Sequence, residues 1–334
     1  MSERIVFPAL LGNDRLRRVF AADAAAGKSA HAYVLEGPPG SGRHTAARLI
    51  AAASLCENRS DPSRPLPCGS CVSCRKILGG LSVDVLTVSR GERATLGVGE
   101  IRTVKETLYV TPNDGERKFY FIEDAHLMTV QAQNALLLSL EEPPPYVLFF
   151  LLCEDASLLL ETIRSRAPVL RMERFQPDFI EEWLESRFPH PDRERLVTAA
   201  HLANGALGMA ENLYRDGDDA LENYRNASEL VRLLLAGRRS ETAAFASALP
   251  LQAKDRARLR QILTLARWAL RDIIADKRGG TLLFYSAKDG LPAYAKKIPL
   301  RRCADLIAKL ARAEEDIASN VTPSLVMTSL AANA

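Results

Sequence analysis

Residues 31–50 read HAYVLEGPPGSGRHTAARLI, and this stretch decides the fold. A short apolar segment (31–36) leads into a turn rich in glycine and proline (37–42), and an alanine-rich helical pattern follows over 43–56. A glycine-rich turn between a strand and a helix is the setting of a phosphate-binding loop, whose backbone N–H groups face phosphate oxygens at a helix N-terminus. The stretch therefore predicts an α/β fold of the phosphate-loop type.

The loop departs from the ATP-hydrolysing pattern, Gly-x-x-x-x-Gly-Lys-[Ser/Thr], at two positions. Gly37, Gly40 and Gly42 supply the glycine frame, but Arg43 stands at the lysine position and His44 at the hydroxyl position. A guanidinium group can still contact phosphate, so a nucleotide or anion in the loop is compatible with the sequence. An imidazole cannot replace the hydroxyl oxygen on Mg²⁺, which prefers oxygen ligands. We therefore predict a degenerate loop that does not hydrolyse ATP.

A second motif is altered further along the chain. The β-rich run 118–122 is followed by Glu123 and Asp124. This order reverses the Asp-Glu pair that normally holds the metal and polarises the attacking water at the end of a strand. Both residues are candidates for a degenerate metal and water motif, and the reversal again argues against an intact hydrolase.

Strand and helix signals alternate through the first half of the chain. Residues 83–88 read as a strand, 101–109 and 129–142 as helices, and 147–153 as a continuous apolar run. Such a run is typical of a strand that is buried on both faces. We predict a parallel sheet covered by helices on both sides, in an α/β domain that spans residues 1–175.

Strand signals largely disappear after residue 177, which predicts a small helical domain over 176–220 and a C-terminal helical domain over 221–334. The net charge is only +3, but residues 175–224 carry 4 Lys/Arg against 11 Asp/Glu, whereas 225–334 carry 19 against 10. Charge blocks of this kind often follow domain edges. We interpret the basic block first as solvated helix faces, and second as a surface that contacts phosphates.

Four of the six cysteines form a cluster with the spacing C-x11-C-x2-C-x2-C. Clustered thiols in a protein expected to be cytoplasmic suggest a metal rather than disulfides. Four thiolates can close a tetrahedral Zn²⁺ site, so the sequence predicts a structural zinc, with an iron–sulfur cluster or free thiols as alternatives. The predicted ligands are Cys56, Cys68, Cys71 and Cys74. Cys153 and Cys303 are expected to be buried apolar side chains.

The composition, 47% hydrophobic and 25% charged, is that of an ordinary soluble protein. The longest apolar run, 147–152, is too short to cross a bilayer. The first ten residues lack the pattern of a signal peptide. A cytoplasmic protein without a membrane partner is expected.

Four features occur in order along the chain. They are the phosphate loop with a four-cysteine insertion after its helix, IEDAH at 122–126, NALL at 134–137 leading to LEEPP at 140–144, and IRSRA at 163–167. Together they resemble the clamp-loader branch of the AAA+ ATPases, most strongly over residues 1–175. The resemblance implies an AAA+ domain with a zinc-binding insertion (56–74), a helical lid (176–220) and a C-terminal collar that joins subunits (221–334).

Within that family, the altered loop and Glu123-Asp124 resemble delta-prime subunits of bacterial DNA polymerase III more than the ATP-hydrolysing gamma/tau subunits. Gly208 also stands where active members place an arginine over the nucleotide. The resemblance implies a rigid, ATPase-deficient subunit that works with gamma/tau and delta subunits to load the sliding clamp onto primed DNA. The alternative is an active DNA-dependent ATPase of the same family.

Ser165-Arg166-Ala167 matches the Ser-Arg-Cys motif of the family except at its third position. The resemblance implies that Arg166 is an arginine finger, which acts in trans on the ATP of a neighbouring subunit. Without the resemblance, Arg166 is simply a surface arginine like Arg164. A zinc-dependent nucleic-acid-binding module ranks last, because no aromatic residue lies among the clustered cysteines.

Overall fold

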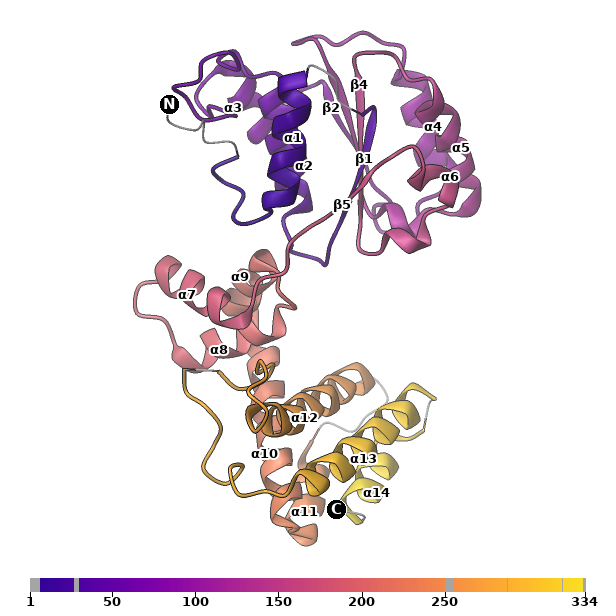
Figure 1. The fold of residues 1–334 in the computed structure, drawn as a ribbon. Coiled ribbons are helices and arrows are strands. Elements are labelled where there is room, and N and C mark those ends of the chain that lie inside the picture. The colour runs from indigo at the N-terminus through magenta and orange to yellow at the C-terminus, as the bar shows by residue number, and fades with distance from the viewer. Residues whose placement is uncertain (1–6, 27–29, 250–254, 287, 320, 333–334) are drawn as a thin grey trace. The chain divides into compact units, whose positions relative to one another are not determined.

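The computed structural model describes residues 7–26, 30–249, 255–286, 288–319 and 321–332 (Figure 1). The chain divides into two compact units, Met1–Arg174 and Phe175–Ala334. Each unit has its own hydrophobic core, and we describe each by itself.

A five-stranded sheet forms the centre of the first unit. Its strands are β1 (Ala32–Glu36), β2 (Val85–Val88), β3 (Lys118–Ile122), β4 (Val147–Cys153) and β5 (Val169–Arg171). Their order across the sheet is β2-β3-β4-β1-β5, and every neighbouring pair is parallel. All residues of β3 and β4 are buried, and for β4 the continuous apolar run predicted this burial. The predicted parallel α/β fold is confirmed.

Helices cover both faces of this sheet (Figure 1). The helices α1 (Asp14–Ala26), α2 (Arg43–Ser54) and α3 (Val72–Leu78) lie on one side, and α4 (Val98–Thr107), α5 (Val130–Glu141) and α6 (Glu161–Arg164) lie on the other. Along β1, Tyr33 and Leu35 pack into the core on one face of the sheet, and Ala32 and Val34 pack into the core on the other face. This alternation follows from the two-residue period of a strand.

The direction of the strands determines where the functional residues meet. Because β1, β3 and β4 are parallel, the segments that follow their last residues lie along one edge of the sheet. The phosphate loop follows β1, Glu123 and Asp124 follow β3, and the short helix η2 (Ala156–Leu158) follows β4. A second short helix, η1 (Ala125–Leu127), continues from Asp124.

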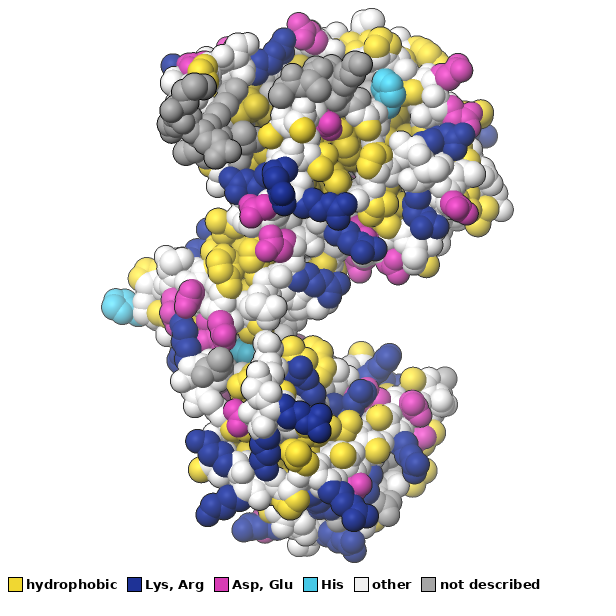
Figure 2. All heavy atoms as spheres, in the orientation of Figure 1, with side chains coloured by type: hydrophobic (Ala, Val, Ile, Leu, Met, Phe, Trp, Pro, Cys, Tyr) yellow, Lys and Arg dark blue, Asp and Glu magenta, His cyan; other side chains and the backbone are white. Residues whose placement is uncertain are grey.

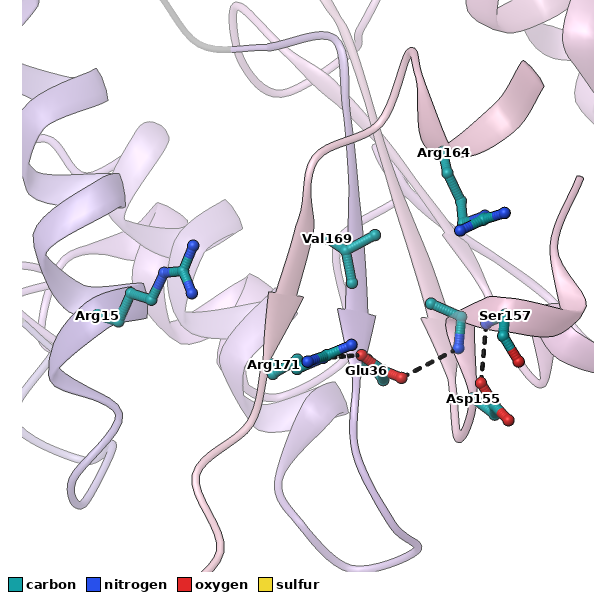
Figure 3. Close-up of a pocket in the computed structure, with 8 residues that line it drawn as sticks. Arg15, Glu36, Asp155, Ser157, Arg164, Val169 and Arg171 are labelled. Atoms are coloured by element: carbon teal, nitrogen blue, oxygen red, sulfur yellow. Dashed lines mark hydrogen bonds and ion pairs between the residues drawn. The ribbon is translucent and has the colours of Figure 1, made fainter. Parts of the chain in front are cut away.

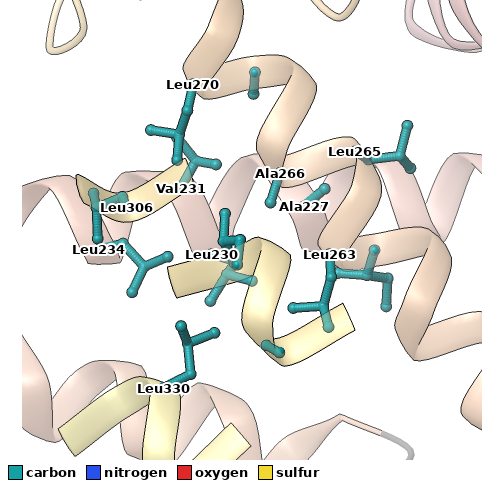
Figure 4. Packing of buried hydrophobic residues seen from close by; sticks show 14 of the residues in the cluster. Ala227, Leu230, Val231, Leu234, Leu263, Leu265, Ala266, Leu270, Leu306 and Leu330 are labelled. Carbon is teal, nitrogen blue, oxygen red and sulfur yellow. The ribbon is translucent and has the colours of Figure 1, made fainter. Parts of the chain in front are cut away.

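The second unit is helical, as predicted. Three helices share a small core: α7 (Pro177–Arg187), α8 (Arg193–Leu202) and α9 (Leu207–Asp216). A larger core, shown in part in Figure 4, lies among α10 (Asp218–Ala236), α11 (Arg239–Ala248), α12 (Arg256–Asp276), α13 (Leu300–Ala318) and α14 (Pro323–Ala332). Among the helices described, none is both long and apolar enough to cross a membrane.

One connection in this unit is very short. Residues 215–219 are polar apart from Gly217, and Gly217 alone separates α9 from α10. Asp218 and Asp219 occupy the first turn of α10, where acidic side chains are favourable because the helix dipole is positive there. Their polarity therefore marks a helix start.

Buried polar residues connect α7 and α8 to the segment between α12 and α13. The carboxylate of Glu181 is fully buried and accepts hydrogen bonds from Ser286 Oγ (3.1 Å) and from His201 Nε2 (3.3 Å). His201 Nδ1 lies 2.8 Å from the carbonyl oxygen of Leu283. The fully buried Asp272 accepts the backbone N–H groups of residues 283–285. A division of this unit at residue 220 stays a prediction.

Candidate functional site

The phosphate loop has the backbone geometry that its glycines predicted. Gly40 and Gly42 have φ of 74° and 90°, a left-handed conformation that strains other residues, and Gly42 directly precedes α2. A Cβ atom on Gly37 would stand 2.8 Å from Cβ of Met172. The N–H of Gly37 donates to the carbonyl oxygen of Cys153 (3.0 Å), which attaches the loop to the end of β4.

His44 and Glu123 come into direct contact. The imidazole Nε2 of His44 lies 3.5 Å from Oε1 of Glu123, with 46% and 32% of the two side chains exposed. Burial lowers the pKa of His44, and the nearby charge of Glu123 opposes this effect. A half-exposed histidine thus occupies the space beside the carboxylate that follows β3.

Asp124 is also engaged by a basic side chain. Its backbone is left-handed (φ 47°), and its carboxylate accepts a hydrogen bond from Nε of Arg90 at 3.1 Å. Both carboxylates after β3 therefore face nitrogen groups from other segments of the chain. Sequence reasoning missed Arg90, because it comes from the segment after β2 and no motif connects it with Asp124.

Two side chains at the loop, Ser41 and Arg43, each have a buried polar atom. Nη1 of Arg43 and Oγ of Ser41 are buried without a hydrogen-bond partner among the described residues. Buried donors that lack a partner are costly, so such groups commonly mark the place of a bound ion, water or ligand. The chemistry of these two donors suits a phosphate oxygen, which accepts from both hydroxyl and guanidinium groups.

Arg166 follows α6 and is held by α5. Its Nη2 donates to Oε1 of Glu141 (3.0 Å), its Nη1 donates to the carbonyl oxygen of Thr162 (3.0 Å), and 38% of its side chain is exposed. Arg164 instead donates to the carbonyl oxygen of Leu159. The two arginines of this motif therefore have different surroundings, although they are only two residues apart.

Arg164 lines a polar pocket at the end of β1 and β5, together with Arg15 (Figure 3). Inside it, Oε2 of Glu36 accepts a hydrogen bond from Arg171 (2.6 Å), and Oε1 of Glu36 accepts the N–H of Ala156 (3.2 Å). No sequence motif predicted this pocket, because its residues come from five separate segments.

The four clustered cysteines converge on one point. The sulfur atoms of Cys56, Cys68, Cys71 and Cys74 all lie within 4.8 Å of one another. Four sulfurs around a tetrahedral zinc, at about 2.3 Å each, stand about 3.8 Å apart, and those of Cys68 and Cys74 are 4.0 Å apart. The cluster is therefore compatible with a structural zinc.

Local hydrogen bonds support this arrangement of sulfurs. The N–H of Cys71 donates to the sulfur of Cys68, and the N–H of Cys74 donates to that of Cys71, each at 3.4 Å. A hydrogen bond from the amide of Asn58 lowers the pKa of the Cys68 thiol to about 5, whereas burial raises the pKa of Cys74. N–H donors directed at sulfur stabilise thiolates, which are the form that binds metal.

Comparisons with protein families and with curated proteins find similarity to subunits of DNA polymerase III. A family model described as DNA polymerase III, delta subunit, matches residues 12–176. The DNA polymerase III subunit gamma of Buchnera aphidicola subsp. Schizaphis graminum is 30% identical over 232 residues, which are 68% of this chain and 62% of that protein. The subunit delta' of Escherichia coli is 32% identical over 195 residues, 58% of this chain and 57% of that protein. The chain thus spans less than two thirds of the length of these relatives.

Among solved structures, a DNA polymerase III gamma subunit-related protein from Thermotoga maritima aligns with a TM-score of 0.46 and 18% sequence identity. The alignment covers 94% of this chain and 97% of that one.

Proposed function

Because the chain belongs to the clamp-loader family of DNA polymerase III subunits, we propose that it is a delta-prime-like subunit that assists clamp loading without hydrolysing ATP. It works beside gamma/tau and delta subunits, and the assembly places the sliding clamp on primed DNA. The observation that carries this proposal is the contact between His44 and Glu123.

That contact occupies the place where a metal-dependent phosphate loop holds Mg²⁺. In such loops the ion lies between the hydroxyl after the lysine and a carboxylate after another strand of the sheet. In this chain His44 holds the hydroxyl position, and its Nε2 is 3.5 Å from the carboxylate of Glu123. Mg²⁺ requires oxygen ligands at 2.0–2.1 Å in near-octahedral geometry. The contact between His44 and Glu123 therefore supports the proposal that this loop does not hydrolyse Mg²⁺-ATP.

The loop retains the means to bind an anion. Its glycine frame and the partnerless donors of Ser41 and Arg43 are compatible with a bound phosphate or nucleotide. We assign such binding a structural role, in which the loop is held closed but no bond is broken.

Arg166 supplies the chemical contribution of this chain, as an arginine finger towards the ATP of a neighbouring gamma/tau subunit. Its partial exposure and its pairing with the half-exposed Glu141 support this role. An exposed ion pair contributes only about 0–1 kcal/mol, so little is lost when the guanidinium leaves Glu141 for a phosphate oxygen.

The remaining parts have structural roles in this proposal. Cys56, Cys68, Cys71 and Cys74 hold a zinc that fixes the insertion between α2 and α3. Helices α7–α9 form the lid, and α10–α14 form the collar that joins the chain to its neighbours.

The rival function is that of an active ATPase, and the similarity to gamma and tau subunits favours it. A reconstituted complex distinguishes the two. Our proposal predicts that omission of this chain abolishes clamp loading. Arg43→Ala should reduce loading only slightly, because it removes one of several groups that hold the loop and no hydrolysis occurs there. An active subunit would lose loading when Arg43 is removed. Loading that is unaffected by omission of the chain would contradict both functions.

A further inference from the structure

Many of the basic side chains described in the helical unit face a carboxylate. Arg193 pairs with Glu181, for example, and Arg225 pairs with Glu194. Five exposed basic residues between the end of α12 and the start of α13 form no ion pair within the described part of the chain. These residues, which we call the C-terminal basic surface, are Lys277, Arg278, Lys296, Lys297 and Arg301.

Contacts between helices bring these residues together. Helices α12 and α13 are antiparallel, because Arg256 near the start of α12 bonds to the carbonyl oxygen of Ile317 near the end of α13. At the opposite end, Nζ of Lys277 donates to the carbonyl oxygen of Ile298 (2.7 Å). The end of α12 therefore lies beside the turn that precedes α13.

That turn presents two lysines to solvent. The N–H of Ile298 donates to the carbonyl oxygen of Ala295 (3.2 Å), which closes a turn with Lys296 and Lys297 at its centre. Ala295 is fully buried and Ile298 packs against the core, so both ends of the turn are anchored. The two lysines are exposed.

The fold explains some basic residues in this region but not others. Arg302 donates to the carbonyl oxygen of Leu234 (2.9 Å), where it satisfies the end of α10. Lys277 and Arg278 follow the C-terminus of α12, where the helix dipole favours positive charge. Lys296, Lys297 and Arg301 surround the N-terminus of α13, where the dipole disfavours them and the first turn has no acidic residue. An anionic partner at this helix end would offset the unfavourable interaction of these charges with the dipole.

We propose that the C-terminal basic surface binds the phosphate backbone of nucleic acid. A protein partner would need an apolar centre, but none of the exposed large hydrophobic residues described lies in this region; those of the helical unit are Phe179 on α7 and Leu325 on α14. The basic residues come from two helix ends and a turn, and such spaced positive charges suit the regularly spaced phosphates of nucleic acid. Binding of these phosphates releases counterions. Figure 2 shows Lys and Arg side chains spread over the C-terminal helices, among fewer acidic ones. The inference adds direct DNA contact to the proposed function and does not depend on it.

The test compares two charge-matched variants of the full chain. Lys296→Gln/Lys297→Gln removes two charges from the surface, and Arg260→Gln/Arg312→Gln removes two exposed charges that are unpaired among the described residues, from other turns of α12 and α13. Binding of a fluorescein-labelled single strand and of its duplex is measured by anisotropy between 50 and 200 mM NaCl. Thermal unfolding confirms that both variants are folded.

The wild-type chain should bind with a Kd on the order of 10⁻⁴ to 10⁻⁶ M, with an affinity that falls steeply with salt. The lysine variant should lose affinity for any sequence, and its slope of log K against log salt should decrease by about 2. The arginine variant should keep the wild-type slope. Equal slopes in all three proteins, or equal losses in both variants, would overturn the inference. So would tighter binding to a poly-glutamate peptide than to DNA, which would indicate an acidic protein partner.

Discussion

The imidazole of His44 and the carboxylate of Glu123 come from segments that follow different strands, β1 and β3, yet they lie 3.5 Å apart. β4 separates these two strands in the sheet, so the side chains reach each other over the end of β4. In an active site of this type, Mg²⁺ and the nucleotide's phosphates fill this space. A direct contact between two side chains fills part of it in this protein.

The first prediction concerns the ionisation of His44. Burial lowers its pKa below the ordinary value of 6.5, and Glu123 acts in the opposite direction. Glu123→Gln should therefore lower the pKa of His44 further, which NMR titration of its ring resonances measures. A pKa that is above 6.5, or that rises in Glu123→Gln, would show that the two groups do not interact as described.

The lowered pKa of His44 makes a small contribution to stability that depends on pH. At a pH between the lowered pKa of His44 in the folded chain and its ordinary pKa in the unfolded chain, the unfolded chain binds a proton that the folded chain does not. The free energy of unfolding therefore falls as the pH falls through this range. Because nearly half of the His44 side chain is exposed, solvent screening keeps the effect small. His44→Gln should remove it, and urea unfolding at pH 7.5 and pH 5.5 measures the difference.

The second prediction concerns the metal. Protein purified without a chelator should contain about one zinc per chain, because four thiolates can complete the coordination of a structural Zn²⁺. Cys71→Ser should reduce the zinc content strongly and lower the Tm, whereas Cys153→Ala, at a buried cysteine of β4, should keep the zinc. Elemental analysis decides, and less than about 0.2 equivalents of any metal in the wild type would refute the site.

The third prediction tests the buried network of the helical unit. Glu181→Gln removes the fully buried carboxylate that faces both Arg193 and His201, and Arg193 keeps only its more exposed partners. The free energy of unfolding should therefore fall by about 3 kcal/mol. Glu185 also pairs with Arg193 but is 40% exposed, and Glu185→Gln should cost less than about 1 kcal/mol. Chemical denaturation measures both. Similar losses in the free energy of unfolding in the two variants would mean that the buried ion pairs of Glu181 are worth no more than an exposed one.

The fourth prediction separates Arg166 from its neighbour Arg164. In a reconstituted complex, Arg166→Ala should slow hydrolysis at one ATP site, where an arginine finger contributes on the order of 10³-fold or more. Total ATPase should fall only in part, because the other sites keep their own fingers, and clamp loading should fall further. Arg164→Ala should have much less effect. Equal, near-wild-type rates for both variants would leave Arg166 as a surface charge.

Local patterns in the sequence predicted much of the fold. The glycine frame before α2 and the apolar run of β4 each depend on neighbouring residues, and both were predicted correctly. β5 was not predicted, because three residues after Pro168 are too few for a strand pattern to be visible.

Long-range contacts were harder to predict. The pairing of Asp124 with Arg90 depends on the order of strands in the sheet, which alternation of strands and helices does not specify. The contact of Glu141 with Arg166 likewise depends on how α5 and α6 pack. The sequence pointed to the glycine-rich loop and to the two carboxylates after β3 as candidates, but not to which side chains would neutralise one another.

The most direct test of the account is steady-state ATP turnover by the purified chain in the presence of Mg²⁺, with and without primed DNA. We predict a rate no higher than that of Arg43→Ala, because His44 and Glu123 contact each other where the metal would have to bind. Mg²⁺-dependent turnover well above background that Arg43→Ala abolishes would contradict the account, because it would show that the loop is an active ATP site.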